Sequence, residues 1–337
     1  MSGCILITGG TGTFGKRYVK HILDTNAYDR VVIFSRDEYK QHIFLKMLYS
    51  TYGKNVIDEK VRFFLGDIRD RERLKIAMRN VTEVIHSAAL KHVPFCEYNP
   101  GEAIKTNVNG TKNVCDVAIE NNVEKVVVLS TDKAVEPINF YGSTKMLAEN
   151  YAVYSNNISK VDSDGNKLTK LSCVRYGNIV GSRGSIVETF NNMKESDHFT
   201  VTDDKMTRFW MHIDEAVKMV NWTLENMSGG EIVIPKIKAS RVTDIAKTVD
   251  SEKTIKIIGI RPGEKIHEQL FNRREHERAY EVEKYYVIVP EEPSWNSQLS
   301  KKYKMFKLTE RKQYTSSDSD LQFSKEDLKL LIERENN

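Results

Sequence analysis

Short apolar runs alternate with amphipathic stretches through the first half of the chain. The apolar runs predict strands, and several are apolar at every position, as expected where both faces of a sheet are covered. Strands are predicted at Cys4–Thr8, Val31–Ser35, Val61–Leu65, Val84–His86, Val126–Leu129 and Leu171–Val174, with helices near 14–24, 37–50, 70–79, 102–121 and 141–156. This alternation predicts an α/β fold with a Rossmann-like, doubly wound parallel sheet.

The rhythm changes after about residue 178. The later predictions are helices near 213–227, 241–250 and 324–334, and short strands at 231–234 and 255–258. Two hydrophilic segments, 50–60 and 156–170, are predicted to be surface loops. We therefore expect a first domain at 1–178, with 213–235 packing back on it, and a smaller C-terminal domain formed mainly by 179–337.

Composition narrows the classes of protein. The 337 residues are 40% hydrophobic and 29% charged, which is typical of a globular protein. The net charge of +4 comes from dispersed Lys and Arg, which argues against nucleic-acid binding but allows a basic pocket. We expect a cytoplasmic protein with no membrane partner, because no run approaches the length of a membrane span. The histidines form no HExxH set, so we expect no metal, and the four cysteines form no CxxC pair.

A glycine-rich turn, TGGTGTFG at 8–15, directly follows the first predicted strand and opens a helix. Glycines three residues apart permit a tight turn, a close approach of backbone to pyrophosphate, and packing of helix on strand. An ordinary glycine-rich turn is the alternative, but the position after the first strand favours a dinucleotide site. The residues predicted to bind the cofactor here are Thr8, Gly9, Gly12, Thr13, Phe14 and Gly15.

The second predicted strand ends at Ser35 and Arg36. An arginine at this position suits a ribose 2′-phosphate, whereas an NAD site usually carries an acid. NADP is therefore favoured over NAD, although Asp37 follows and Arg36 has an alternative interpretation as a solvated strand-end residue. Asp67 and Ile68, after the third strand, are predicted to flank the adenine.

The stretch STDKAVEPINFYGSTK, at 130–145, follows the fifth predicted strand. Tyr141 and Lys145 are four residues apart and share one face of a helix. An ammonium beside a phenol stabilises the phenolate, and so does the positive charge of an oxidised nicotinamide, so the pair predicts a tyrosine base that works near neutral pH. Thr131 is placed to orient a substrate hydroxyl, or is only a strand-end hydroxyl. Taken alone, the next two residues, Asp132 and Lys133, would be an ordinary surface pair.

Further strings extend through nearly the whole chain. They are SRDEYKQ (35–41), AALKHVPFCEYNP (88–100), TNVNGT (106–111), VRYGNIVGSRGS (174–185), MTRFWM (206–211), GGEIVIPKI (229–237) and RPGEKIHE (261–268). With the glycine-rich turn and YxxxK, they resemble the extended short-chain dehydrogenase/reductase family. STDKA, GSRGS and MTRFW are similar to strings of a narrower group, the inverting UDP-N-acetylglucosamine 4,6-dehydratases of the type that begins pseudaminic acid synthesis.

The resemblance implies a hydro-lyase that converts UDP-N-acetylglucosamine to UDP-2-acetamido-2,6-dideoxy-β-L-arabino-hexos-4-ulose, with tightly bound NADP that is recycled. Tyr141 would take the proton of the sugar 4-OH, Lys133 would take the C5 proton, and Asp132 would protonate the departing 6-OH. The product could lead to a pseudaminic-type sugar or to other L-configured sugars. The family also implies a homo-oligomer, a dimer or a larger ring.

The other site predictions combine side-chain chemistry with this resemblance. Guanidinium groups match phosphate oxygens bidentately, which favours Arg208 and Arg261 as diphosphate ligands. The remaining residues predicted to contact the cofactor are Ala88, Ala89, Lys91, Tyr141, Lys145 and Tyr176. Those predicted to contact the UDP-sugar are Lys91, Lys133, Asn178, Met206, Arg208, Arg261 and Glu264. Residues 1–178 would thus form the NADP-binding domain, and 179–337 the substrate-binding domain.

The adjacent Asp132 and Lys133 pose a problem of protonation. A lysine base needs a lowered pKa, whereas an acid needs a raised pKa, and an ion pair opposes both shifts. We expect one proton to be shared across the site. Two alternatives remain open: a UDP-sugar 4-epimerase, which has no use for this pair, and a non-catalytic NADP-binding protein, which commonly lacks the tyrosine or the lysine.

Overall fold

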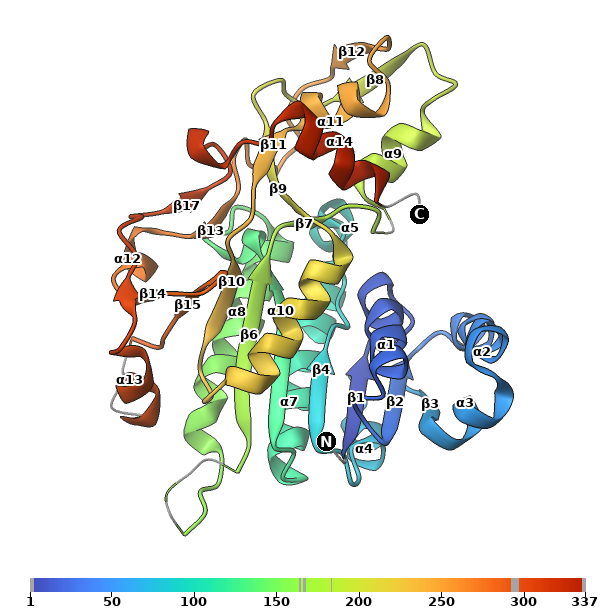
Figure 1. The fold of residues 1–337 in the computed structure, drawn as a ribbon, viewed down its shortest axis with the longest axis vertical. Coiled ribbons are helices and arrows are strands. Elements are labelled where there is room, and N and C mark those ends of the chain that lie inside the picture. Colours follow the sequence, from blue (N-terminus) through green and yellow to red (C-terminus); the bar gives the residue numbers. More distant parts are fainter. Residues whose placement is uncertain (1–2, 164, 166–167, 183, 292–296, 335–337) are drawn as a thin grey trace.

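The computed structural model describes residues 3–163, 165, 168–182, 184–291 and 297–334. Its main feature is a ten-stranded sheet (Figure 1). From one edge to the other, the strands are β16 (Lys307–Leu308), β14 (Ala279–Val282), β15 (Tyr285–Ile288), β10 (Ile232–Pro235), β6 (Lys170–Tyr176), β5 (Lys125–Thr131), β4 (Glu83–His86), β1 (Cys4–Thr8), β2 (Arg30–Ser35) and β3 (Val61–Leu65). The run from β10 to β3 is parallel throughout, which confirms the predicted sheet.

Helices cover both faces of this sheet. The alternation of side chains along β1 sends Ile5 and Ile7 into one hydrophobic core and Leu6 into the other. The first core contains residues of α1 (Thr13–Thr25), α2 (Glu38–Tyr52) and α10 (Ile213–Asn226), and the second contains residues of α4 (Arg71–Ala77), α7 (Gly110–Glu120) and α8 (Phe140–Tyr154). The doubly wound arrangement therefore follows from strands that are apolar on both faces.

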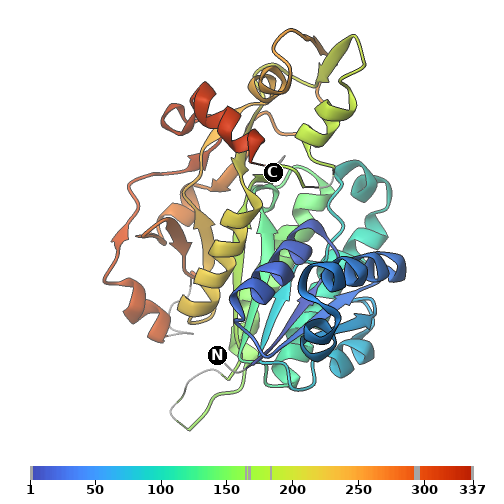
Figure 2. The ribbon, with the colours of Figure 1, turned by 45° about the vertical axis from the view of Figure 1, so that its right-hand side comes forward.

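The C-terminal half contributes to the sheet and also forms a lobe above it (Figures 1 and 2). Three small sheets join β7 (Asn178–Ile179), β9 (Thr207–Met211) and β11 (Ala239–Arg241); β8 (His198–Val201) and β12 (Thr254–Ile257); and β13 (Gln269–Phe271) and β17 (Tyr314–Thr315). A third core around Trp210 packs α9 (Ile186–Asn192), α11 (Val242–Val249) and α14 (Lys325–Glu333) together. The lobe overhangs the ends of the parallel strands.

One sequence prediction needs correction, and a second needs refinement. Residues 50–60 do not form a loop, because α2 continues to Tyr52 and a separate helix, α3 (Lys54–Lys60), follows. Only Ile57 of α3 is buried, so the helix packs on the protein through one side chain. The rest of its sequence is hydrophilic, which led to the prediction of a loop. The helix predicted at 102–121 is present but irregular, because α6 (Pro100–Ala103), a π-helical turn (Ile104–Asn109) and α7 follow one another without a gap.

The prediction for 156–170 is confirmed for the most part. A single 3-10 turn (Ser155–Ile158) precedes irregular chain, while residues 164, 166 and 167, and also Arg183 of the GSRGS string, lie outside the described residues.

Cys96, Cys115 and Cys173 are buried free thiols, and Cys4 is partly exposed. No helix in the described ranges is both long and apolar enough to cross a membrane.

A buried arginine ties the C-terminal segment to the sheet. Arg175 on β6 is only 2% exposed. Its guanidinium pairs with Glu149 of α8 and with Glu275 of α12 (Arg273–His276), where two of its nitrogens lie 2.8 and 3.0 Å from the carboxylate oxygens. The same group donates to the carbonyl oxygen of Leu270 on β13 at 2.9 Å. Arg175 therefore fixes the position of β13, the strand that follows the RPGEKIHE segment.

Replacing Arg175 by Met should lower the free energy of unfolding by about 3–5 kcal/mol, because two buried carboxylates lose their counter-ion. Arg274→Met is the matched control, because Arg274 pairs with Glu291 but is 79% exposed, and its loss should cost under about 1 kcal/mol. Chemical denaturation followed by circular dichroism measures both. Equal destabilisation by the two changes would contradict the anchoring role of Arg175.

Candidate active site

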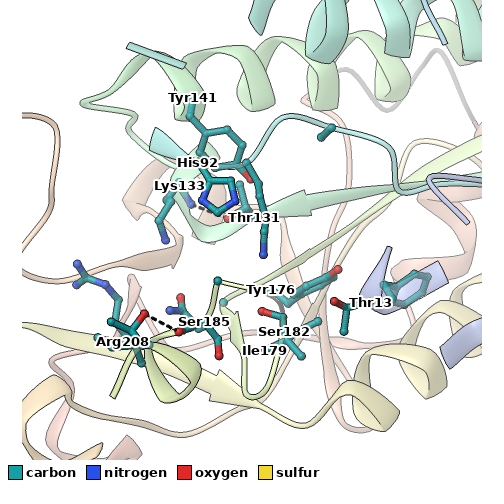
Figure 3. A pocket seen from close by; sticks show the side chains of 18 of the residues that line it. Thr13, His92, Thr131, Lys133, Tyr141, Tyr176, Ile179, Ser182, Ser185 and Arg208 are labelled. Carbon is teal, nitrogen blue, oxygen red and sulfur yellow. Dashed lines mark hydrogen bonds between the residues drawn. The ribbon is translucent and has the colours of Figure 1, made fainter. Parts of the chain in front are cut away.

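A cavity of about 780 Å³ lies between the parallel strands and the C-terminal lobe. In Figure 3, Tyr141, Lys133 and Thr131 lie on one side of it and Arg208 and Ser185 on the other. Many of the predicted site residues line this one cavity: Gly9, Gly12, Thr13, Phe14, Gly15, Ala89, Lys91, Thr131, Lys133, Tyr141, Lys145, Tyr176, Asn178, Met206, Arg208, Arg261 and Glu264. They come from both halves of the chain.

The other predicted site residues do not line the cavity: Thr8, Ser35, Arg36, Asp67, Ile68, Ala88 and Asp132. Thr8 is fully buried, and its Oγ1 lies 2.7 Å from Nδ1 of His86 on the neighbouring strand. Arg36 is at the surface, 3.6 Å from a carboxylate oxygen of Asp67, which also binds Arg69. Asp132 is fully buried directly behind Lys133.

The glycine-rich turn has the geometry of a phosphate cradle. Gly12 is the N-cap residue of α1 and has no side chain that could cap the helix, whose N-terminus borders the cavity. A Cβ on Gly15 would lie 2.5 Å from Cα of Gly10, so only glycine permits this packing of helix on turn. A helix N-terminus with close backbone approach favours an anion, and these residues therefore fit a dinucleotide pyrophosphate.

The STDKA segment turns sharply where β5 ends. Thr131 Oγ1 donates to Asp132 Oδ1 at 2.8 Å, and Asp132–Ala134 form a single 3-10 turn. Asn139 then caps α8 by accepting from the amide of Gly142 at 2.7 Å. A Cβ on Gly142 would lie 2.3 Å from the carbonyl oxygen of Lys133, so glycine in YGSTK lets the helix approach the turn. This close approach places Tyr141 and Lys133 beside each other.

Lys145 and Tyr141 share the cavity wall, but the protein's own groups do not lower the pKa of Tyr141. Burial raises the pKa of Tyr141 to about 12, and the nearby cation that opposes this rise is Lys133. Lys145 donates to the carbonyl oxygen of Leu129 at 2.7 Å, and burial lowers its pKa. The protein's side chains alone therefore do not account for a tyrosine base near neutral pH, and the combined effect of Lys145 and an oxidised nicotinamide stays a prediction.

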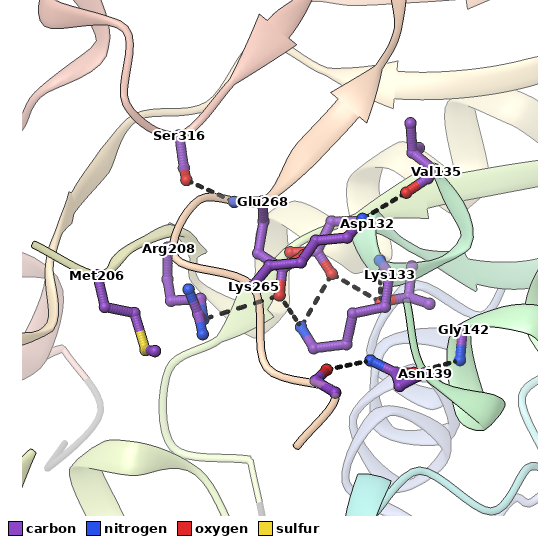
Figure 4. A network of polar contacts seen from close by, with 12 residues as sticks. Asp132, Lys133, Val135, Asn139, Gly142, Met206, Arg208, Lys265, Glu268 and Ser316 are labelled. Atoms are coloured by element: carbon purple, nitrogen blue, oxygen red, sulfur yellow. Dashed lines mark hydrogen bonds and ion pairs between the residues drawn. The ribbon is translucent and has the colours of Figure 1, made fainter. Parts of the chain in front are cut away.

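Lys133 lies between two buried carboxylates (Figure 4). Its Nζ is 3.1 Å from Asp132 Oδ1 and 3.2 Å from Glu268 Oε1. On the far side of Glu268, Arg208 Nε is 3.8 Å from the same Oε1. Arg208 is itself oriented by its hydrogen bonds to the carbonyl oxygens of Thr207 and Ile266, at 2.7 and 3.1 Å. The predicted acid and base thus belong to a larger charged network.

This network corrects one protonation expectation and agrees with another. Burial alone would lower the pKa of Lys133, but the charges of Asp132 and Glu268 outweigh it and raise that pKa. The lowered lysine pKa expected of a base is therefore not found. Burial raises the pKa of Asp132 despite the opposing effect of Lys133, which is the direction an acid needs. Burial acts in the same way on Glu268, but Lys133 and Arg208 prevail and lower its pKa.

Two residues with evident structural roles were missed from the sequence. Glu268 belongs to the quoted RPGEKIHE string, but nothing in the string shows that its carboxylate is buried against Lys133. Asn107 lies in the π-helical turn, and its amide binds both the NH and the carbonyl of Leu90 and the hydroxyl of Thr144, at 2.8–3.0 Å. It joins the AALKH loop to α8. The extra residue of a π-turn often marks such sites.

The candidate site consists of polar and charged side chains around an open cavity. Within the described part of the chain, no group of three or more His, Cys, Asp or Glu residues is arranged to hold a metal ion. The described arrangement instead places the phenol of Tyr141 and the amines of Lys133 and Lys145 at the cavity wall, with the buried acid Asp132 behind Lys133, beside a turn that fits a dinucleotide. It is suited to moving protons next to a redox cofactor.

Comparison with known proteins agrees with this geometry. Residues 5–290 match the family described as polysaccharide biosynthesis protein. The chain is 47% identical to the UDP-N-acetylglucosamine 4,6-dehydratase (inverting) of Campylobacter jejuni strain 81-176, over 85% of this chain and 82% of that protein. It is 40% identical to the UDP-glucose 4-epimerase of Rickettsia rickettsii, over 84% and 82%.

A solved structure is similar over almost the full length. The X-ray structure of Pen from Bacillus thuringiensis covers 99% of this chain, and 98% of Pen is matched, at 35% identity and a TM-score of 0.86. The family match extends from β1 to just beyond β15 and includes every cavity-lining segment described above. The chain therefore belongs to the polysaccharide biosynthesis protein family, within the extended short-chain dehydrogenases/reductases.

Proposed function

We propose that this protein is an inverting UDP-N-acetylglucosamine 4,6-dehydratase that uses a bound nicotinamide dinucleotide. The observation that carries the proposal is the Asp132–Lys133 pair at the end of β5, with Lys133 in the same cavity as Tyr141 and Lys145. The Campylobacter relative, which is named for this activity, supports it. The product would be the 4-keto-6-deoxy sugar with the L configuration, destined for an L-configured or pseudaminic-type sugar.

Each of the chain's own groups has a step in this reaction. Tyr141, oriented with Thr131, takes the proton of the sugar 4-OH. Lys133 takes the proton of C5. The departing 6-OH receives a proton from Asp132 by way of the Thr131 hydroxyl, which lines the cavity and lies 2.8 Å from Asp132 Oδ1, and it leaves as water. C5 then receives a proton on its opposite face, which balances the proton that Tyr141 took from the 4-OH and exchanged with water. Two protons are thus taken up, two are delivered, and Tyr141 is a phenolate again. A nicotinamide dinucleotide held at the glycine-rich turn would supply the redox chemistry, as the acceptor and then the donor of one hydride.

The resting charges are compatible with this sequence of steps. Because Lys133 Nζ is 3.1 Å from Asp132 Oδ1, its proton can pass to the aspartate within the pair. The transfer leaves a neutral amine facing the cavity and a protonated acid beside it, which are the forms that the C5 and O6 steps need. After both steps, the amine is an ammonium again and the aspartate a carboxylate. The positive charge of an oxidised nicotinamide would lower the pKa of Tyr141 for the first step.

A UDP-sugar 4-epimerase is the competing function, and the Rickettsia relative carries that name. An epimerase needs Tyr141 and Lys145 but neither an acid for O6 nor a base for C5. Three charged groups, Asp132, Glu268 and Arg208, are buried around Lys133. Their burial costs folding free energy unless they are fully paired or serve the reaction. The network therefore favours the dehydratase.

The two halves of the chain would divide the ligands between them. We assign NADP to residues 1–178, with the glycine-rich turn at the pyrophosphate, Arg36 at the 2′-phosphate and Asp67 and Ile68 near the adenine. The segment 213–235 packs back through α10 and β10. The UDP-sugar is assigned mainly to 179–337, with Arg208 and Arg261 at the diphosphate.

The protein is also proposed to be a homo-oligomer. Phe95 and Tyr98 of α5 (Val93–Tyr98) and Leu147 of α8 are exposed large hydrophobic side chains. Helices α5 and α8 contact each other, so these side chains belong to neighbouring surface elements. An apolar surface of this kind suits a second copy of the chain.

The purified protein, with NADP and UDP-N-acetylglucosamine and no added reductant, should release a nucleotide sugar lighter by one water. Mass spectrometry measures this loss. The near-ultraviolet absorbance of reduced nicotinamide should show no net build-up, because the hydride returns to the sugar. An isomer of unchanged mass would instead indicate the epimerase.

Tyr141→Phe should lower kcat by roughly 10²–10⁴-fold with little change in KM, because the base that starts the reaction is lost. The activity of the unaltered enzyme should fall as the pH decreases, since protonation removes the phenolate form of Tyr141. Tyr154→Phe, an exposed tyrosine on the same helix, is the control and should retain full activity. Full activity of Tyr141→Phe would exclude Tyr141 as the base.

Arg36→Ala should weaken NADP binding by roughly tenfold to a hundredfold while leaving NAD binding nearly unchanged, because only NADP carries the 2′-phosphate. Fluorescence titration with each nucleotide measures the ratio. Arg71→Ala removes a similar surface arginine, paired with Glu120, and should alter neither affinity. A parallel loss of both affinities in Arg36→Ala would contradict the assignment.

A further inference from the structure

Glu268 contacts the reaction machinery without lining the cavity. Its side chain is 2% exposed, and one carboxylate oxygen, Oε1, lies 3.2 Å from Lys133 Nζ. Among the described residues, its other oxygen, Oε2, is buried and accepts no hydrogen bond. Any influence of Glu268 on a sugar in the cavity must therefore act through Lys133 or Arg208.

The backbone of Glu268, which directly precedes the short strand β13, is held firmly. Its NH donates to Ser316 Oγ at 2.9 Å, and its carbonyl oxygen accepts from the NH of Ser316 at 2.8 Å. Ser316 Oγ is also 2.7 Å from Thr207 Oγ1 on β9. Two residues further on, Arg175 holds the carbonyl oxygen of Leu270. Three separate segments thus fix the position of one carboxylate.

The two carboxylates beside Lys133 differ in their preferred charge. Burial raises the pKa of Asp132, which favours uptake of a proton. Burial also tends to raise the pKa of Glu268, but the cations Lys133 and Arg208 lower it, which favours a permanent anion. Lys133 and its two partners, Asp132 and Glu268, also interact electrostatically with titratable groups of other segments. These groups are Tyr141, Arg208 and Lys265. Asp132 is therefore the proton carrier and Glu268 the fixed charge.

We propose that Glu268 is a positioning residue, which anchors Lys133 Nζ beside Asp132 so that the proton can pass between them and the free amine faces the sugar at C5. This inference rests on the proposed function, since it assigns Lys133 the C5 step. Glu268 belongs to the half of the chain that would bind the sugar, whereas Lys133 belongs to the nucleotide half. The anchor therefore makes the base depend on the correct packing of the two halves.

The test compares two half-reactions in Glu268→Gln, Glu268→Asp and a control. In a single turnover, reduction of the bound nicotinamide reports the step at C4, and release of dehydrated sugar reports the later elimination. Glu268→Gln should reduce nicotinamide at nearly the normal rate but eliminate water roughly 10²-fold more slowly, because the base is misplaced. Glu281→Gln, which also removes the partner of a lysine (Lys236, at 2.9 Å) but on β14, should alter neither step.

A second readout needs no turnover. Lys133 faces the cavity, so an amine-reactive reagent should label it in its neutral form, and mass spectrometry of its peptide gives the pH of half-labelling. Glu268→Gln should lower that pH by about one unit or more, because a neighbouring anion is lost. Glu268→Asp keeps the charge but shortens the reach, so it should label as the unaltered protein does and still eliminate slowly. If Glu268→Gln does not fold, slow elimination by Glu268→Asp still tests the positioning role of Glu268.

The outcomes separate the two claims. An unchanged half-labelling pH in Glu268→Gln, or loss of both half-reactions together, would overturn the positioning role. If the unaltered protein forms no dehydrated sugar but Glu268→Gln still shifts the labelling of Lys133, the proposed function fails and the anchor stands. Slow elimination with a shifted labelling midpoint supports both.

Discussion

The ion pair between Lys133 and two buried carboxylates is the interaction on which the site depends. A lysine taken out of water is costly unless its charge is compensated, and Asp132 alone would leave it tied to its own turn. Glu268 supplies the second anion from the other half of the chain, at 3.2 Å. The requirement to satisfy these charges thus joins residues 1–178 and residues 179–337 at one point.

Several features of the fold serve that junction. Gly142 lets α8 approach the carbonyl oxygen of Lys133, and Asn139 reaches across to the carbonyl oxygen of Gly263 at 2.8 Å. Lys265 donates to the carbonyl oxygen of Val135 at 2.5 Å, which places the RPGEKIHE segment on the turn after β5. The segment is therefore attached to the residues that follow Lys133 by two hydrogen bonds, each between a side chain and a backbone carbonyl oxygen. Such pre-organisation lets a few polar groups act without rearrangement.

The sequence was sufficient for the sheet and for most of the cavity wall, because fully apolar runs and the glycine-rich turn encode them locally. It was insufficient where long-range packing decides. The hydrophilic 54–60 segment is a helix held by Ile57, the antiparallel strands at 279–288 extend the sheet, and the π-turn redirects Asn107. Protonation was the least predictable property, since the pKa directions of Lys133 and Tyr141 follow from burial and from Glu268, which no local pattern reveals.

The central claim is that Lys133 and Asp132 act on C5 and O6 of a nucleotide sugar that has been oxidised at C4. Proton NMR of the product made from UDP-N-acetylglucosamine in deuterated water tests this most directly, because it reports both the isotope and the configuration at C5. The account predicts a 4-keto-6-deoxy sugar with deuterium at C5 and the inverted configuration there. A dehydrated sugar that keeps its original hydrogen and configuration at C5, or a 4-epimer alone, would contradict it.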